Sequence, residues 1–205
     1  MRKAQSMQLR QPEKIYIDTN VWFSYITRGV YDSHFEKAQT IIDDVNNNNE
    51  HIAIISHLSL LELVNSIRNG VIRKAEYQGK LNENTDIEFD LKNRIDHYIK
   101  DVMDIITKWE ASGKLQIVDV KTPLTQILKQ TQLLQRKTFG SINDSDTCMT
   151  CKSKRYGYYY RGVDHWDIQH ALIAKEGKVN TFVTFDRGFN KLKQYFNNDY
   201  EIRVK

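Results

Sequence analysis

The chain has 205 residues, of which 40% are hydrophobic and 11% aromatic, and its formal net charge is only +4. This composition excludes an intrinsically disordered chain and predicts one domain with a substantial core, or one domain that carries an insertion. No apolar run approaches the ~18 residues of a membrane-spanning helix and the N-terminus lacks the apolar region of a signal peptide, so we expect no membrane partner.

The first third of the chain predicts alternating strands and helices after a loosely held polar tail at residues 1–13. Apolar periodicity and capping residues indicate strand 15–17, helix 21–27, helix 33–45, strand 52–55, and a helix that begins after Ser56 and ends at Asn69-Gly70. Ser33 and Ser56 are the expected N-caps of two of these helices. The second of the two helices carries an apolar stripe and, on another face, a stripe of polar residues that includes Glu62.

The middle of the chain, at about 71–162, is mainly helical and reads as an insertion. Its expected elements are a long amphipathic helix over 87–109 that Gly113 ends, a strand at 115–118, a helix from near Pro123 to Leu134, and an irregular loop over 139–162. The long helix would serve as an extra arm, a partner-binding surface or a contact between two copies of the chain in a homodimer.

The last part of the chain returns to strand–helix alternation. We expect a helix capped by Asp164 that ends at Gly177, a buried strand over 181–185 that Asp186 terminates, a helix around 189–196 and a short strand over 200–204. Alternation at both ends of the chain predicts an α/β fold with a parallel sheet covered by helices on both faces.

Four carboxylates occupy comparable positions in this pattern. Asp18 and Asp186 each follow a buried strand, Glu62 lies two turns into a helix, and Asp167 lies in the first turn of another. In a parallel sheet such positions can converge on one cleft. Like charges 4 Å apart repel by roughly 4 kcal/mol at an effective dielectric near 20. A convergent cluster would therefore need protons or a cation, and a hard divalent ion, Mg²⁺ or Mn²⁺, is the natural occupant because it prefers oxygen ligands.

Each carboxylate also has an ordinary structural interpretation. Asp18 and Asp186 are good helix caps, and Glu62 fits a solvated polar face. Asp167 lies three residues after Asp164, which is the capping-box spacing. Only the joint order of the four acids favours a site.

That order resembles the PIN-domain nucleases, including the VapC-like toxins. Four short motifs over about residues 14–69 and 163–205 carry the resemblance: Asp18-Thr19-Asn20 after a strand, Glu62 in the helix after the next strand, Asp167-Ile168-Gln169-His170-Ala171 in a helix, and Thr184-Phe185-Asp186-Arg187-Gly188-Phe189 after a strand. The stretch at 71–162 is longer than compact members of the family have between the second and third acids.

The resemblance implies a PIN-like nuclease domain over residues 14–205 with the helical insertion at about 71–162, acting as an endoribonuclease on an RNA substrate. Asp18, Glu62, Asp167 and Asp186 would hold one or two Mg²⁺ or Mn²⁺ ions, which would activate a water for attack on a phosphodiester. Asn20 and Thr184 would orient ligands or waters. Asp164 would reach the same cleft, although its N-cap role is the simpler interpretation. The resemblance also implies the toxin of a toxin–antitoxin pair, with an antitoxin protein as partner.

A basic and tyrosine-rich segment precedes the third acid. Its candidate RNA-binding residues are Lys152, Lys154, Arg155, Tyr158 and Arg161. Cations hold phosphates and tyrosines stack on unpaired bases, so the segment suits single-stranded RNA. A hairpin whose tyrosines pack on the core explains it equally well.

The two cysteines, Cys148 and Cys151, are too few for a disulfide framework, which fits a reducing, cytoplasmic location. Their spacing is that of a metal-ligand pair, which His165 and His170 or a second chain would have to complete, so two reduced thiols are the default. Two other functions stay open: a PIN-like scaffold that binds RNA or protein without cutting, and a structure-specific DNA nuclease. Phosphoryl transfer through an aspartyl phosphate is disfavoured, because Asn20 stands where dehalogenase-type enzymes need a second Asp.

Overall fold

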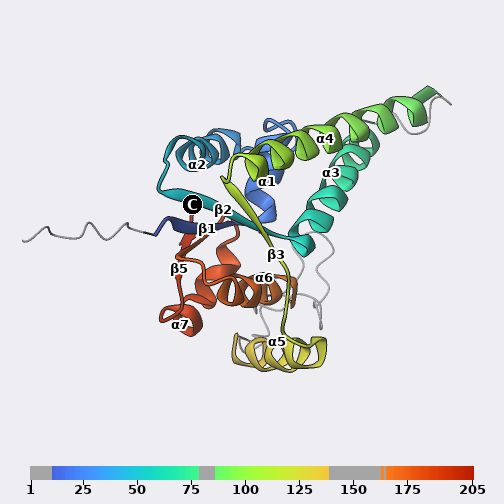
Figure 1. Cartoon of the computed structure of the whole chain (residues 1–205). Helices are drawn as coiled ribbons and strands as arrows, with labels where there is room; N and C mark the ends of the chain where they lie inside the picture. The colour runs from blue at the N-terminus through green and yellow to red at the C-terminus, as the bar shows by residue number, and fades with distance from the viewer. Residues whose placement is uncertain (1–10, 79–85, 139–162, 164) are drawn as a thin grey trace, which may run out of the picture.

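The protein is described by a computed structural model that covers residues 11–78, 86–138, 163 and 165–205. Its centre is a five-stranded sheet in the order β3-β2-β1-β4-β5, in which every neighbouring pair is parallel (Figure 1). The strands are β1 (Glu13–Ile17), β2 (His51–Ser56), β3 (Leu115–Val118), β4 (Thr181–Thr184) and β5 (Glu201–Val204). The α/β fold with a parallel sheet that the sequence predicts is therefore confirmed.

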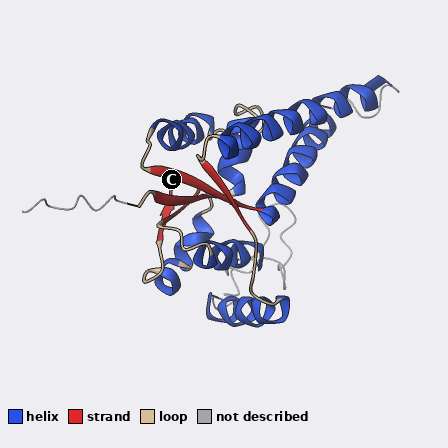
Figure 2. Ribbon diagram, viewed as in Figure 1, coloured by secondary structure: helices blue, strands red, loops and turns tan. Residues whose placement is uncertain are grey.

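Helices cover both faces of the sheet (Figure 2). They are α1 (Thr19–Ile26), α2 (Phe35–Asn47), α3 (His57–Tyr77), α4 (Asp86–Ala111), α5 (Leu124–Thr138), α6 (His165–Glu176), α7 (Lys193–Phe196) and a 3₁₀ turn, η2 (Arg187–Lys191). The first four lie on one side of the sheet, and α6 and α7 lie on the other, where α5 packs against α6. Among the helices described, none combines the length and the apolar character that crossing a bilayer requires.

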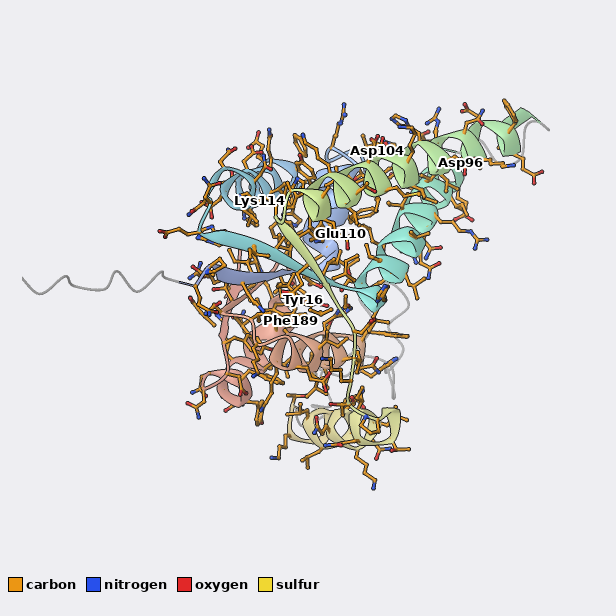
Figure 3. All side chains as sticks on the ribbon, viewed as in Figure 1. Tyr16, Asp96, Asp104, Glu110, Lys114 and Phe189 are labelled. Carbon is orange, nitrogen blue, oxygen red and sulfur yellow. The ribbon has the colours of Figure 1, made fainter. Side chains whose placement is uncertain are left out.

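The alternation of β1 explains how one strand serves two cores. Ile15 and Ile17 point into the core beneath α1–α4, whereas Tyr16 points into the core beneath α6. On that second side Tyr16 stacks on Phe182 with ring centroids 5.0 Å apart, and Figure 3 shows Tyr16 and Phe189 between the sheet and α6. The strand at the middle of the sheet is thus buried on both faces, which accounts for its short continuous apolar run.

Some expected helices differ from the observed ones, and the single helix expected around 189–196 is the 3₁₀ turn η2 followed by the short helix α7. The N-cap of α2 is His34 and not Ser33, and the His34 side chain makes no cap hydrogen bond. The helix α3 does not end at Asn69-Gly70 but continues to Tyr77. A Cβ on Gly70 would lie 3.1 Å from Cζ of Phe23 and 3.5 Å from Cγ of Tyr31. This glycine therefore permits a close approach of two segments and does not stop the helix.

The stretch between the second and third acids contributes to the same sheet. The strand β3 pairs with β2 in parallel, from Ala53 opposite Leu115 to Ser56 opposite Val118. The long helix expected at 87–109 is present as α4, and its Trp109 packs edge-on against Trp22 of α1, with ring centroids 5.5 Å apart. Helices α3 and α4 run side by side away from the sheet as an arm (Figure 1).

Candidate functional site

The candidate site begins at the carboxyl edge of the two central strands. The strand β1 ends at Ile17, which is paired with Val183 of β4. The backbone N–H of Asp18 donates to the carbonyl of Val183 at 3.0 Å. Because the chain leaves this strand pair toward opposite ends of the sheet, the two strand ends form the topological switch point at which α/β proteins bind ligands.

All four predicted acids line one cavity at this edge, with a volume of about 920 Å³. Asp18 comes from the end of β1, Glu62 from α3, Asp167 from the first turn of α6, and Asp186 from the residues after β4. Within the described ranges, no three His, Cys, Asp or Glu side chains are gathered into a group that could hold a metal ion. The carboxylates thus face a shared space from different walls without forming a compact cage.

Asp18 is the most buried of the four carboxylates, with 5% of its surface exposed. Its Oδ1 accepts a hydrogen bond from the backbone N–H of Thr19 at 2.8 Å, and its Oδ2 accepts one from the Thr184 hydroxyl at 2.6 Å. Burial raises the pKa of Asp18, and His170 and the Thr184 hydrogen bond oppose that rise only in part. Asp18 is therefore both the N-cap of α1 and a carboxylate whose charge is poorly solvated.

Glu62 is held by two side chains and is not simply a solvated surface residue. Its Oε2 accepts from the Thr19 hydroxyl at 2.6 Å and lies 2.8 Å from Nε2 of His170. Burial acts to raise the pKa of Glu62, but the hydrogen bond and charge of His170, together with Thr19, bring the pKa below its usual value. The carboxylate is thus kept ionised and oriented.

Asn20 and Thr184 join the two strand ends. The Thr184 hydroxyl, which donates to Asp18, accepts from the Asn20 amide at 3.0 Å and from the backbone N–H of Asp186 at 2.9 Å. The Asn20 amide oxygen accepts from the N–H of Phe185 at 3.1 Å. Asp186 itself caps η2 by accepting from Gly188 at 2.6 Å, and it still lines the cavity. The capping interpretation and the site interpretation of Asp186 are therefore compatible.

A buried polar network behind Glu62 was not predicted. The Tyr16 hydroxyl lies 2.6 Å from Oγ of Ser59, 3.0 Å from Oγ of Ser56 and 3.0 Å from Nδ1 of His170. His170 is 1% exposed and connects this network to Glu62. The available sequence signal was spacing, because His170 lies one helical turn after Asp167 and Ser59 lies one turn before Glu62.

Several predicted site residues lie outside the described residues. They are Asp164, the candidate RNA-binding residues Lys152, Lys154, Arg155, Tyr158 and Arg161, and the candidate zinc ligands Cys148 and Cys151. The roles suggested for them stay predictions.

We expect Thr184→Val to lower the free energy of unfolding by about 2–3 kcal/mol. The Thr184 side chain is fully buried, and removing its hydroxyl leaves Oδ2 of Asp18 without a donor and the Asn20 amide and the Asp186 N–H without an acceptor. Thr184→Ser is the matched control, because it keeps the hydroxyl and loses one methyl group, at a cost of about 1 kcal/mol. Urea unfolding followed by circular dichroism measures the free energy of unfolding of both variants and of the wild type. Equal losses in the two variants would show that the hydroxyl contributes nothing.

Comparisons with known proteins identify no family. No family model matches the chain, and no curated protein matches it. Among solved structures, the crystal structure of VapBC2 from Rickettsia felis bound to a DNA fragment from their promoter is similar over 93% of this chain and 98% of that chain. The TM-score is 0.46 and the sequence identity 14%. This similarity is too low to assign the chain to a family.

Proposed function

We propose that the chain is a Mg²⁺- or Mn²⁺-dependent endoribonuclease with a PIN-like active site. The observation that carries the proposal is the convergence of Asp18, Glu62, Asp167 and Asp186, from four separate segments, on one cavity at the switch point of a parallel sheet. If these residues served only as helix caps or as solvated surface residues, they would not need to face the same cavity. The order and spacing of the four motifs along the chain support the same function.

The chemistry of the donors fits a hard divalent cation, because all four acids offer carboxylate oxygens and Asn20 adds an amide at the cavity wall. The four carboxylates would hold one or two ions. The ions would supply a nucleophilic water and stabilise negative charge on the phosphoryl oxygens.

The side chains around the acids hold them ready for this role. Thr184 and the Thr19 backbone fix both oxygens of Asp18, and the Thr19 hydroxyl and His170 fix one oxygen of Glu62. Each oxygen of Asp18 accepts one of these hydrogen bonds and so keeps a second lone pair, whereas Oε2 of Glu62 already accepts two, which leaves Oε1 of Glu62 to face a ligand. Asp186 is exposed and Asp167 is half-buried, so both are accessible from the cavity.

The physiological role that we propose is the toxin of a toxin–antitoxin pair, with RNA as substrate and an antitoxin protein as partner. This role rests on the resemblance of the four motifs to VapC-like toxins. The alternatives are a PIN-like scaffold that does not cut and a structure-specific DNA nuclease. Four carboxylates that face one cavity, with the charge of Glu62 acting on Asp18, favour an enzyme over a scaffold.

The test compares the wild-type chain with Asp167→Asn on single-stranded RNA and on branched DNA, with Mg²⁺, with Mn²⁺ and with chelator. We expect metal-dependent RNA cleavage by the wild type and none by Asp167→Asn, with unchanged circular dichroism. Asp96→Asn is the matched control, because Asp96 is an exposed carboxylate on the α4 arm (Figure 3). Cleavage of branched DNA alone would favour the DNA nuclease, and undiminished cleavage by Asp167→Asn would remove Asp167 from the site.

A further inference from the structure

The polar face of α3 extends the candidate site well beyond the acids. Glu62, Ser66, Asn69, Arg73 and Tyr77 recur at intervals of three or four residues along this helix, and all five line the same cavity. Residues at such intervals share one helical face. We call these five residues, together with Lys74, the α3 stripe. From Glu62 to Tyr77 it is about 22 Å long, at 1.5 Å per residue.

The character of the α3 stripe changes along its length. It is acidic at Glu62, neutral at Ser66 and Asn69, and basic and aromatic at its far end, where Arg73, Lys74 and Tyr77 lie. The helix runs from the edge of the sheet out along the arm (Figure 1), so the basic end lies away from the carboxylates. The cavity therefore joins an acidic end, at the four carboxylates, to a basic end that suits an anion.

The basic end presents both charge and aromatic surface. Arg73 is exposed, and no carboxylate of the described residues forms an ion pair with it. Tyr77 is 93% exposed although it is a large aromatic side chain. Lys74 donates to the carbonyl of Val30 at 3.0 Å and lies 5.3 Å from the ring centroid of Tyr31, which also lines the cavity. A single exposed tyrosine is ordinary. Tyr77, however, lies on the same helical face as Arg73 and lines the cavity that contains the acids, so the two side chains together suit a ligand.

We propose that the α3 stripe binds the unpaired nucleotides on one side of the scissile phosphodiester. Arg73 contacts a phosphate, Lys74 adds positive charge beside it, and Tyr77 stacks on a base. The inference rests on the proposed function, since it names the substrate of that site as a single strand. It also provides a nucleic-acid contact on the described part of the chain, separate from the segment at 152–161.

The combination of contacts favours a single strand over a duplex. A tyrosine ring can stack on a base only when the base is free of its partner, and every unpaired base offers such a face. Cations spaced along a groove follow the phosphates without reading the sequence. The length of the α3 stripe is sufficient for several nucleotides, so these contacts fix the direction in which the strand leaves the acids.

The experiment measures binding without cleavage, in full-length Asp167→Asn, by fluorescence anisotropy with a 12-nucleotide unpaired RNA. Adding Tyr77→Ala should weaken binding on the order of tenfold, as expected for one lost stacking contact. Adding Arg73→Gln should reduce the slope of log K against log salt concentration by about 0.7. In the cleaving chain both changes should raise KM and leave kcat nearly unchanged.

The controls lie on the same arm but outside the cavity. Arg68→Gln removes an exposed arginine of α3, and Phe89→Ala removes an aromatic of α4 that is 71% exposed; neither residue lines the cavity. Both should bind the RNA as the parent does. A duplex of the same sequence should bind more weakly than the single strand.

The possible results separate the two proposals. Cleavage that Tyr77→Ala and Arg73→Gln leave unaltered would overturn the role of the α3 stripe and leave the nuclease intact. Binding that depends on both residues in a chain that cleaves nothing would support the stripe and overturn the proposed function. Equal affinity for duplex and single strand would overturn the stripe as a site for unpaired nucleotides.

Discussion

Asp18→Asn is expected to reduce metal-dependent cleavage of single-stranded RNA by at least about 100-fold, since loss of even an outer partner of a metal ligand costs 10- to 100-fold. The fold should persist. The amide removes a buried carboxylate, which relieves its desolvation, but it cannot accept from both the Thr19 N–H and the Thr184 hydroxyl. Because these two effects oppose each other, the free energy of unfolding without metal should change by less than about 2 kcal/mol.

The same variant should alter how stability depends on pH. Burial raises the pKa of Asp18 above its ordinary value of 3.8, so the folded state holds this proton more tightly than the unfolded state does. The resulting stabilisation is present below pH 3.8 and is lost as the pH rises through the higher, folded pKa. The wild type should therefore lose stability relative to Asp18→Asn as the pH increases from acid toward neutral.

Unfolding in urea at several pH values, with and without Mn²⁺, measures these differences. A metal at 100 times its Kd should stabilise the wild type by about 2.7 kcal/mol and should stabilise Asp18→Asn far less. Asp104→Asn is the control, because Asp104 is an exposed carboxylate of α4 that pairs with Lys100. Equal stabilisation of the wild type and Asp18→Asn by Mn²⁺ would place the metal elsewhere.

Phe182→Ala is expected to lower the free energy of unfolding by about 3–5 kcal/mol. Phe182 is fully buried in β4, and its ring centroid lies 5.0 Å from that of Tyr16, 4.7 Å from that of Phe189 and 6.2 Å from that of Tyr200. Truncation removes these contacts and leaves a cavity that the surrounding aromatic rings cannot fill. The strand that positions Thr184 and Asp186 would lose much of its support on that face.

The measurement is again urea unfolding, with Phe89→Ala as the control. Phe89 is 71% exposed on α4, so its truncation should change stability by less than about 0.5 kcal/mol. A loss below about 1 kcal/mol for Phe182→Ala would mean that the aromatic cluster beneath α6 contributes little to the stability of the fold.

The sequence was informative wherever a local pattern decides the structure. Asp18 directly follows β1 and Asp186 lies two residues after β4, and a run of apolar residues that stops at a capping residue predicts both the strand and the approximate position of the acid. Parallel pairing then brings these two residues to the same edge. The α/β fold and the order of its main elements could be read in this way.

The sequence did not predict the features that depend on contacts between segments far apart in the chain. Gly70 signals a helix end, but it permits the close approach of Phe23 and Tyr31, which no local pattern reveals. Burial of His170 against Tyr16 and Glu62 depends on how α6 and α3 meet across the sheet. For the same reason the basic end of α3 was not predicted, since the helix was expected to stop before Arg73.

The position of β4 next to β1 determines when the candidate site can assemble during synthesis. Asp18 is bound by Thr184, which lies 166 residues later in the chain. A nascent chain on the ribosome therefore lacks Asp167 and Asp186, two of the four carboxylates at the cavity, until α6, β4 and the residues after β4 have emerged. Such sequence-distant pairing also makes assembly slow. Under the proposed function, the chain could thus cut neither the ribosome nor the messenger that produces it before translation has passed Asp186.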